Sequence, residues 1–252
     1  MTVTPHIEPP SPWTESIEVP AGEYLLSPDL GGKRLISSFS LDRYPVTVAR
    51  FRLFMEMGGY DDWEYWDDEG WHWRQTTGIT APRLWDGSNP DIDGMFTTVV
   101  GDHLEEFSFP TRPVIGVSLF EAEAFCRFFG RRLPTAAQWE AAARGPTGLP
   151  YPWGSHWPKT GITQWGNRGQ GRRITAPVDH FPEARGPFGH DALVGNVWQW
   201  TTTPWNPALI DGPKTVKGGA WSSPQSQCTT AAQNGFKPGH QWTHLGFRTA
   251  GL

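Results

Sequence analysis

Side chains suited to ligand recognition gather near the carboxyl end of the chain, in the segment 222–244. This segment contains hydroxyl, amide, imidazole and indole groups and has little apolar content of its own. Aromatic runs interrupted by glycine lie on both sides of it, and a well-anchored loop of this composition is where recognition residues usually lie. We therefore predict a loop that binds a protein or a small molecule through the following side chains: Ser222, Ser223, Gln225, Gln227, Thr229, Gln233, Asn234, Lys237, His240, Trp242 and His244, with Trp205 nearby.

Standard reactive motifs are missing from the sequence. There is no glycine-rich phosphate loop, no H-E-x-x-H and no C-x-x-C pattern, and no nucleophile-elbow motif supports a serine-based triad. Eight histidines are scattered singly, and His240 and His244 alone have the i, i+4 spacing of a helical metal pair. Gly239 before them and the expected strand after them favour surface or substrate-contacting roles over that metal site. We predict no catalytic residue.

The two cysteines, Cys126 and Cys228, could form at most one bridge, which excludes a disulfide framework. Cys126 falls on the apolar face of an expected helix, where a buried core thiol is more common than a nucleophile. Glu140 lies in another expected helix and could act as an acid or a base, although a lone helical glutamate is usually solvated or ion-paired. Neither Cys126 nor Glu140 is therefore assigned to catalysis.

Charge and hydropathy narrow the range of partners and compartments. The formal net charge is −5 and no run of Lys and Arg exceeds two residues, which argues against nucleic acid or an anionic membrane as a partner. The first residues, MTVTPHIEPPSPW, lack the basic and apolar regions of a signal peptide, and no run approaches the roughly 18 apolar residues of a membrane span. We expect a cytoplasmic protein.

Glycine, proline and tryptophan are unusually abundant. The chain of 252 residues contains 29 Gly and 24 Pro, and this abundance without low complexity is typical of a loop-rich fold. Fifteen Trp and 14 Phe argue against disorder, because such side chains bury large areas. We predict a single domain with an aromatic core over residues 17–252, preceded by a Pro-rich tail or strap over residues 1–16.

The first half of the chain contains strand signals followed by helix signals. Residues 16–40 include two strand-like pieces broken by Pro and Gly, which predicts a hairpin. Apolar residues at helical spacing then predict a helix over 48–57 with Thr47 as its N-cap. Residues 60–75 fit no period, so we expect a loop whose tryptophans fill the core or, alternatively, form the wall of a pocket. Residues 78–111 form a long insertion rich in Gly, Pro and Asp.

Two capping boxes mark helices in the second half. Ser118 and Glu121 precede an apolar face that ends at a glycine, which predicts a helix over roughly 119–129. Thr135 opens a second capping box before the short helix AAQWEAAAR. Regular patterns then fade until three aromatic runs near the carboxyl end, LVGNVWQW, VKGGAWSSP and HLGFRTAGL. Their glycines are typical of short buried strands whose backbones approach closely.

The blocks of this chain resemble one known family in their order and spacing. The sequence contains, in succession, YPVTVARFRLFM, RPVIGVSLFEAEAFCRFFGRRLPTAAQWEAAARG, YPWG, GNVWQW, KGGAWSSP and HLGFR. This order is similar to that of the formylglycine-generating enzyme and sulfatase-modifying factor family. The resemblance implies an α+β, irregular, loop-rich fold of the C-type-lectin-like kind, with few helices and short twisted antiparallel strands. It does not by itself fix the activity, because the family is functionally divided.

Two enzyme branches of the family differ from this chain at their metal sites. Copper-dependent oxidases carry two cysteines in the loop after a GGSW-like block, where two thiolates bind Cu(I). Here that loop offers Cys228 alone, so the resemblance does not extend to formylglycine synthesis. The segments GGYDDWEYWDDEGWHW and QNGFKPGHQWTHLGFR look more like the C-terminal domain of ergothioneine-type sulfoxide synthases. Those enzymes bind non-haem iron through an added helical domain, so this chain resembles their substrate-recognition half, unless another subunit supplies the iron.

Calcium sites of the family match this chain only in part. The family pattern D-x-x-G-N-V-W-E-W has Ala192 and Gln199 in place of its two carboxylates here, with Asp191 one position away. Because Ca²⁺ favours anionic oxygens, the resemblance leaves Asp191, Asn196 and Asn167 as weak calcium candidates and assigns no firm cofactor.

A retained scaffold without the cysteine pair favours one function over the others. We predict a non-catalytic binding domain that displays the loop 222–244, in the manner of the variable proteins of diversity-generating retroelements, which resemble this family in fold. The alternative is a metal-dependent oxidoreductase of the formylglycine-generating or sulfoxide-synthase type, using non-haem iron or copper. A structural subunit of a larger complex is the third interpretation.

Overall fold

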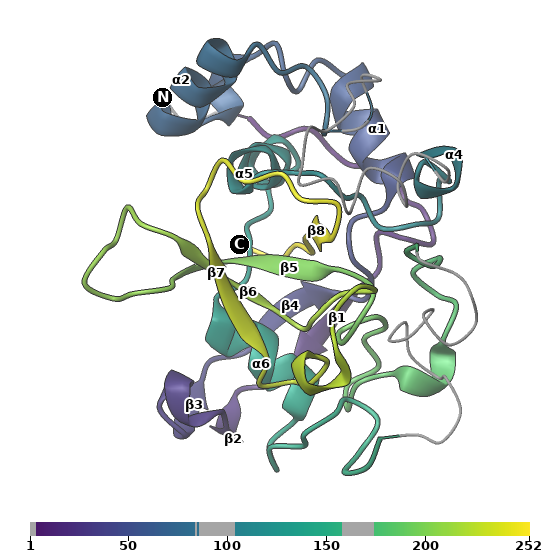
Figure 1. Cartoon of the computed structure of the whole chain (residues 1–252), viewed down its shortest axis with the longest axis vertical. Helices are drawn as coiled ribbons and strands as arrows, with labels where there is room; N and C mark the ends of the chain where they lie inside the picture. The colour runs from purple at the N-terminus through teal and green to yellow at the C-terminus, as the bar shows by residue number, and fades with distance from the viewer. Residues whose placement is uncertain (1–3, 84, 86–103, 158–173) are drawn as a thin grey trace.

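Short strands and short helices alternate with long irregular connections throughout the molecule (Figure 1). The computed structural model describes residues 4–83, 85, 104–157 and 174–252. The predicted loop-rich α+β fold is confirmed, and the shortest α-helix among the described residues, α4, spans only Leu104–Phe107. Within the described ranges, no helix is long and apolar enough to cross a membrane.

The hairpin predicted for residues 16–40 is present as two nested antiparallel ladders. β1 (Ser16–Val19) pairs with β4 (Phe39–Asp42) in the outer ladder. Between them, β2 (Gly22–Leu25) pairs with β3 (Lys33–Ile36). The inner ladder packs against helix α6, so the first strands of the chain cover one side of the molecule.

The largest sheet has four strands in the order β7, β6, β5, β8. These are β5 (Trp198–Pro204), β6 (Lys214–Lys217), β7 (Gln233–Phe236) and β8 (Leu245–Gly246). β5 and β8 run parallel, and the other neighbours are antiparallel. The aromatic runs predicted to form strands contain the start of β5, the end of β6 and the whole of β8. β7 arises inside the predicted loop 222–244, so part of that segment is sheet.

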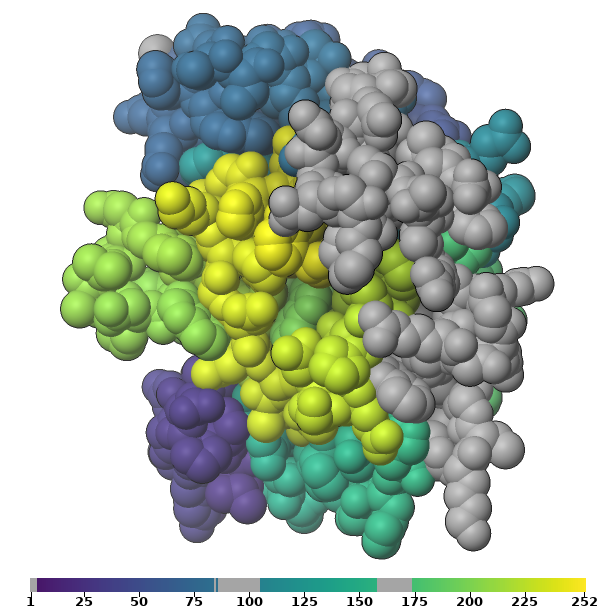
Figure 2. Space-filling view, in the orientation of Figure 1, coloured from purple at the N-terminus to yellow at the C-terminus, as the bar shows by residue number. Residues whose placement is uncertain are grey.

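A hairpin loop joins β5 to β6 and projects from the body of the molecule (Figures 1 and 2). Internal hydrogen bonds hold its residues 205–213, among them Trp205 N–H to Pro213 O at 2.8 Å and Leu209 N–H to Asn206 O at 2.9 Å. The hairpin is therefore a structured arm of the molecule.

Three predicted helices are confirmed to within about a residue at their ends. α1 spans Val48–Glu56, α5 spans Leu119–Phe128 and α6 spans Ala136–Arg144. The predicted N-cap of α1 forms, and so do both capping boxes, in which the Ser118 and Thr135 hydroxyls accept hydrogen bonds from backbone N–H groups in the first turn. The signals were reliable because each helix also buries an apolar face.

The loop predicted for residues 60–75 is wrong, because α2 occupies Asp68–Thr77. Asp67 caps this helix by accepting a hydrogen bond from Gly70 N–H at 2.7 Å, and Gly78 ends it with φ at 67°. The helix lies on the surface, and Gly70 alone among its residues is fully buried. It therefore has no apolar stripe that a periodicity argument could detect.

The aromatic core lies between helices α1 and α5 and the four-stranded sheet. Phe51 of α1 stacks on Phe125 of α5 with ring centroids 5.7 Å apart, and both rings meet Phe247 edge-on. Trp200 of β5 is fully buried in the same cluster. Cys126 lies in this core as predicted, 2% exposed.

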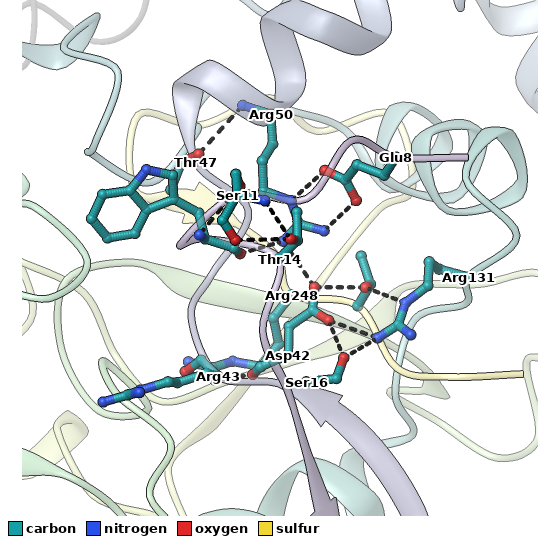
Figure 3. Close-up of polar contacts among 12 residues, drawn as sticks. Glu8, Ser11, Thr14, Ser16, Asp42, Arg43, Thr47, Arg50, Arg131 and Arg248 are labelled. Carbon is teal, nitrogen blue, oxygen red and sulfur yellow. Dashed lines mark hydrogen bonds and ion pairs between the residues drawn. The ribbon is translucent and has the colours of Figure 1, made fainter. Parts of the chain in front are cut away.

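A buried polar network ties the last block of the sequence to the first strands (Figure 3). Arg248 is fully buried and donates from Nε to Gln199 Oε1 at 2.6 Å, and Gln199 Oε1 also accepts from Trp139 Nε1 at 2.8 Å. The terminal nitrogens of Arg248 donate at 2.8 to 3.0 Å to four backbone carbonyls, those of Asp42, Arg43, Asp191 and Ala192. The side-chain amide oxygen of Gln199 therefore accepts hydrogen bonds from two buried donors, Arg248 and Trp139.

Asp42 holds the other side of this network together (Figure 3). Its carboxylate accepts hydrogen bonds from four side chains, those of Ser16, Arg50, Arg131 and Thr249, at 2.6 to 2.9 Å. Arg50 also donates to both carboxylate oxygens of Glu8, at 2.6 and 2.8 Å. The N-terminal segment thus lies against α1, and β1 begins at the last residue of the predicted tail.

Candidate functional site

The C-terminal segment 236–244 is fixed by backbone hydrogen bonds to two elements of the core. Three bonds do this: Leu119 N–H to Pro238 O at 2.9 Å, Gly116 N–H to Trp242 O at 3.1 Å and Trp198 N–H to His244 O at 2.8 Å. The start of α5 and the start of β5 therefore set the path of the segment. Its side chains are presented from a rigid backbone, as a binding site requires.

Glu121 of α5 adds a side-chain anchor to this segment. Its Oε2 accepts a hydrogen bond from Gln241 Nε2 at 2.9 Å, and its Oε1 accepts one from Tyr60 OH at 2.5 Å. Ser118 donates two more, from its N–H and its hydroxyl, both at 2.7 Å. Burial raises the pKa of Glu121 to about 7, and these donors oppose the rise because they favour the carboxylate. The capping glutamate thus has a second role that the capping pattern did not predict.

Three ring side chains of the segment, His240, Trp242 and His244, form what we call the His–Trp cluster. His240 stacks on Trp242 with centroids 5.5 Å apart, and His244 meets the same indole edge-on at 4.9 Å. Phe236 of β7 packs against Trp242 at 4.8 Å. Burial lowers the pKa of His244 to about 4, and burial together with nearby Lys237 lowers the pKa of His240. Both imidazoles are therefore neutral at pH 7, with one donor and one acceptor nitrogen each.

Several of the predicted ligand-binding side chains make hydrogen bonds within the fold. Three of them accept from nearby backbone N–H groups: Ser223 Oγ from Ala220 at 3.0 Å, Thr229 Oγ1 from Ala232 at 3.0 Å and Asn234 Oδ1 from Gly235 at 2.8 Å. A fourth, Gln233 Nε2, donates to Asp29 at 3.2 Å. Polar groups bonded in this way stabilise the loop. Residue type alone did not distinguish them from groups that face a ligand.

The remaining predicted residues differ in exposure. Gln227 and Lys237 are exposed, whereas Ser222 and Gln225 are half-buried. Trp205 lies on the β5–β6 hairpin and packs over the backbone of β7, where a Cβ on the glycine of that strand would come within 2.3 Å of the indole. The segment 222–244 is therefore not one uniform polar surface, and its ring residues gather at one end.

A groove opens between α2 and the β5–β6 hairpin, with the C-terminal segment at its inner end (Figure 2). Its volume is about 470 Å³. Six of its lining residues are Glu69, Trp73, Phe120, Asp211, Lys237 and Pro238. Of these six, Lys237 was predicted individually, and Glu69 and Trp73 belong to the segment 60–75. The groove itself was not predicted, because the walls meet only in the folded molecule. The alternative interpretation of residues 60–75, an aromatic wall of a pocket, agrees with the position of Trp73.

The weak calcium candidates are bonded in other ways or lie outside the described residues. Asp191 pairs with two arginines, at 2.9 and 3.0 Å. The Asn196 amide donates to Ala176 O at 3.1 Å and accepts from Ala176 N–H at 3.2 Å. Asn167 lies outside the described ranges. Within those ranges, no three His, Cys, Asp or Glu side chains come together as metal ligands.

A copper site of two thiolates does not fit the cysteines of this chain. Cys228 is fully buried, and burial raises the pKa of its thiol to about 12. Cys126 lies in a different hydrophobic cluster, and burial raises the pKa of its thiol as well. A two-thiolate Cu(I) site needs both sulfurs at one place, whereas these two cysteines are held in separate parts of the core.

The sequence profile of the sulfatase-modifying factor enzyme 1-like domain matches residues 5–251. Hercynine oxygenase of Mycolicibacterium smegmatis is 35% identical over 90% of this chain and 54% of its own length. Formylglycine-generating enzyme of Bos taurus is 31% identical over 96% of this chain and 75% of its own length. The chain spans only 37 to 54% of the length of the three hercynine oxygenases that it matches.

Solved structures of similar shape support the C-type-lectin-like fold that the motifs implied. PvdO from Pseudomonas aeruginosa superposes with a TM-score of 0.64 at 18% identity, covering 94% of each chain. Treponema denticola variable protein 1 superposes with a TM-score of 0.62 at 17% identity, covering 93% of this chain and 94% of its own. At these identities the likeness shows the fold alone.

The prediction of a non-catalytic binding domain that acts like a variable protein is wrong. It rested on the missing cysteine pair, but the relatives that match most of this chain include hercynine oxygenases and formylglycine-generating enzymes, which are oxidoreductases. The absence of one copper arrangement excludes that arrangement and leaves the reaction class open. The family resemblance read from the motifs is confirmed, and the chain belongs to the sulfatase-modifying factor enzyme 1-like family.

Proposed function

We propose that this chain acts in an oxidoreductase that oxidises a small imidazole-bearing molecule of the hercynine type, and that the His–Trp cluster binds this substrate. The observation that carries the proposal is the 35% identity with hercynine oxygenase over 90% of the chain. Formylglycine synthesis is the less favoured oxidation, because the two buried cysteines do not fit a copper-thiolate site.

The chemistry of the His–Trp cluster suits a flat nitrogen heterocycle. Trp242 offers an aromatic surface for stacking, and neutral imidazoles beside it can donate and accept hydrogen bonds. Nδ1 of His240 is buried and has no hydrogen-bond partner among the described residues. A buried polar atom without a partner costs free energy, so a ligand that supplies the partner gains affinity there.

In the described part of the chain, no three His, Cys, Asp or Glu side chains lie close enough together to hold the redox metal of such an enzyme. The proposal therefore assigns substrate binding, and not the metal centre, to this surface. In that arrangement His240 and Trp242 orient the heterocycle, and the anchored backbone of 236–244 keeps the two rings in place.

A chimaeric enzyme tests the proposal. This chain replaces the matching half of the Mycolicibacterium smegmatis hercynine oxygenase, and oxygen uptake is measured with and without hercynine. We expect hercynine-dependent oxygen uptake, and we expect His240→Ala combined with Trp242→Leu to reduce it about tenfold or more, the size of a lost substrate-positioning contact. His180→Ala combined with Trp63→Leu serves as the matched control, because both rings are exposed and lie outside the loop 222–244.

Calorimetry on the chain alone separates substrate binding from turnover. We expect hercynine to bind the unmodified chain and to bind the double variant more weakly. A folded chain that gives no heat with hercynine, together with a folded chimaera that consumes no oxygen with it, contradicts the proposal.

A further inference from the structure

The groove between α2 and the β5–β6 hairpin has the size and lining of a small-molecule site. Its volume of about 470 Å³ falls in the range of ligand pockets, roughly 300–1,000 Å³. Trp73 and Phe120 form an aromatic wall, with ring centroids 5.4 Å apart. Pro213 of the hairpin and Pro238 of the C-terminal segment add apolar surface on the other sides.

The groove is preformed. Trp73 lies so close to the C-terminal segment that a Cβ on Gly239 would come 2.7 Å from its Nε1. In the hairpin, a Cβ on Gly212 would come 3.0 Å from Leu209, so the turn is equally close-packed. Glycine lets the backbone approach closely at both positions, and a preformed site loses less conformational entropy when a ligand binds.

Charged groups of both signs line the groove and come from three elements. Glu69 of α2 and Asp211 of the hairpin supply carboxylates on opposite walls, and Lys237 of the C-terminal segment supplies an ammonium group. Within the described part of the chain, none of the three forms an ion pair. All three are exposed at the groove and remain able to meet charges on a ligand.

We propose that this groove binds a small zwitterionic amine with an apolar body, of which an aromatic amino acid is the simplest example. The ligand's ammonium group pairs with Glu69 and Asp211, its carboxylate pairs with Lys237, and its apolar body lies against Trp73 and Phe120. A simple cation meets repulsion from Lys237, and a simple anion meets repulsion from the two carboxylates. The groove adjoins the His–Trp cluster through Lys237 and Gly239, but its other walls come from α2, α5 and the β5–β6 hairpin. The inference does not depend on the proposed oxidation.

Titration calorimetry with three related probes tests the charge requirement. L-phenylalanine has both charged groups, 3-phenylpropionate lacks the ammonium group and 2-phenylethylamine lacks the carboxylate. We expect L-phenylalanine to bind most tightly and each of the other two to bind about fivefold more weakly, as expected for one exposed charge pair. No metal or oxygen is needed, so the outcome is independent of turnover.

Charge variants assign each end of the ligand. Lys237→Gln should remove the preference for L-phenylalanine over 2-phenylethylamine, and Glu69→Gln should reduce the preference over 3-phenylpropionate. Lys33→Gln and Glu64→Gln are the matched controls, because both residues are exposed charges that do not line the groove. The controls should leave all three affinities unchanged.

A blocking variant tests the location without removing a structural residue. Thr76 lines the groove on the exposed face of α2, and Thr76→Trp should fill it and weaken L-phenylalanine binding about tenfold or more. Gln75→Trp introduces the same ring at an exposed neighbour that does not line the groove, and it should bind normally. The proposal is overturned if the folded protein gives no heat with L-phenylalanine, or if Thr76→Trp and both charge variants bind it as the unmodified protein does.

Discussion

Two regions built from the same C-terminal stretch of chain use their polar side chains in opposite ways. Arg248 is fully buried and makes five hydrogen bonds to oxygens from three parts of the sequence, residues 42–43, 191–192 and 199. A few residues earlier, the His–Trp cluster holds two neutral imidazoles on an anchored backbone, and Nδ1 of His240 lacks a partner among the described residues. Complete hydrogen bonding identifies groups that hold the fold, whereas an unmet polar group on a rigid surface identifies one available to a ligand.

The largest stability loss should come from the fully bonded region. Arg248→Met removes the Arg248 donors from four buried backbone carbonyls and one of the two donors of Gln199 Oε1, so the free energy of unfolding should fall by about 3–5 kcal/mol. Urea denaturation measures this loss. Arg127→Met removes a surface arginine that is 40% exposed and should cost less than about 1 kcal/mol. Equal losses in the two variants would remove the distinction between the regions.

Glu121 is buried in the core and also bonds Gln241 of the C-terminal segment. Its titration should be visible in the pH dependence of the free energy of unfolding. Its pKa is raised from 4.5 to about 7, so the folded state holds a proton that the unfolded state releases between these values. The contribution of Glu121 to the free energy of unfolding should therefore be greatest below about pH 4.5. It should fall by about 3 kcal/mol as the pH rises through 7. Glu121→Gln should remove this part of the pH slope in urea denaturation curves. An unchanged slope in the variant would show that Glu121 is ionised at neutral pH in the folded protein.

His190, next to the carbonyl acceptors of Arg248, should act in the opposite pH direction. Burial lowers its pKa to about 3, so below about pH 6.5 the unfolded state binds a proton that the folded state does not. Its contribution to stability should fall as the pH decreases from 6.5, by about 2 kcal/mol at pH 5. In urea denaturation curves, His190→Leu should reduce this loss of stability at acid pH. His180→Gln, at an exposed position, should leave the loss unchanged.

The smallest effect should come from a loop hydroxyl predicted to contact a ligand. Ser223 Oγ accepts a hydrogen bond from Ala220 N–H in a buried turn, so Ser223→Ala should lower the free energy of unfolding by about 1 kcal/mol. Hercynine affinity should not change, because the hydroxyl is already bonded. A large loss of hercynine affinity with an unchanged free energy of unfolding would show that Ser223 contacts the ligand and does not only stabilise the loop.

Local sequence signals predicted the parts of the fold that carry both a cap and an apolar face. Ser118 and Thr135 each precede such a face, and both helices formed as expected. α2 was missed because its cap, Asp67, lies among several other acids and its helix has no apolar stripe. Whether an acidic, aromatic segment is a loop or a surface helix depends on what it packs against, which a single sequence does not show.

His240, Trp242 and His244 were named from residue type, and the structure brings their rings together, but their surroundings were not predicted. Gln241 was absent from the predicted site, and its bond to Glu121 joins residues 120 positions apart in the sequence. Ser223 and Asn234 were included because they are polar, yet their hydrogen bonds go to nearby backbone. The groove could not be predicted from residue type or from local sequence, since Glu69, Asp211 and Lys237 meet only through the tertiary fold.

The most direct test of the central claim measures hercynine-dependent oxygen uptake and unfolding in the same chimaeric protein. His240→Ala combined with Trp242→Leu should reduce oxygen uptake about tenfold or more while lowering the unfolding free energy by much less than Arg248→Met does. Unchanged oxygen uptake in the double variant, with hercynine still required, would contradict the assignment of this cluster to the substrate.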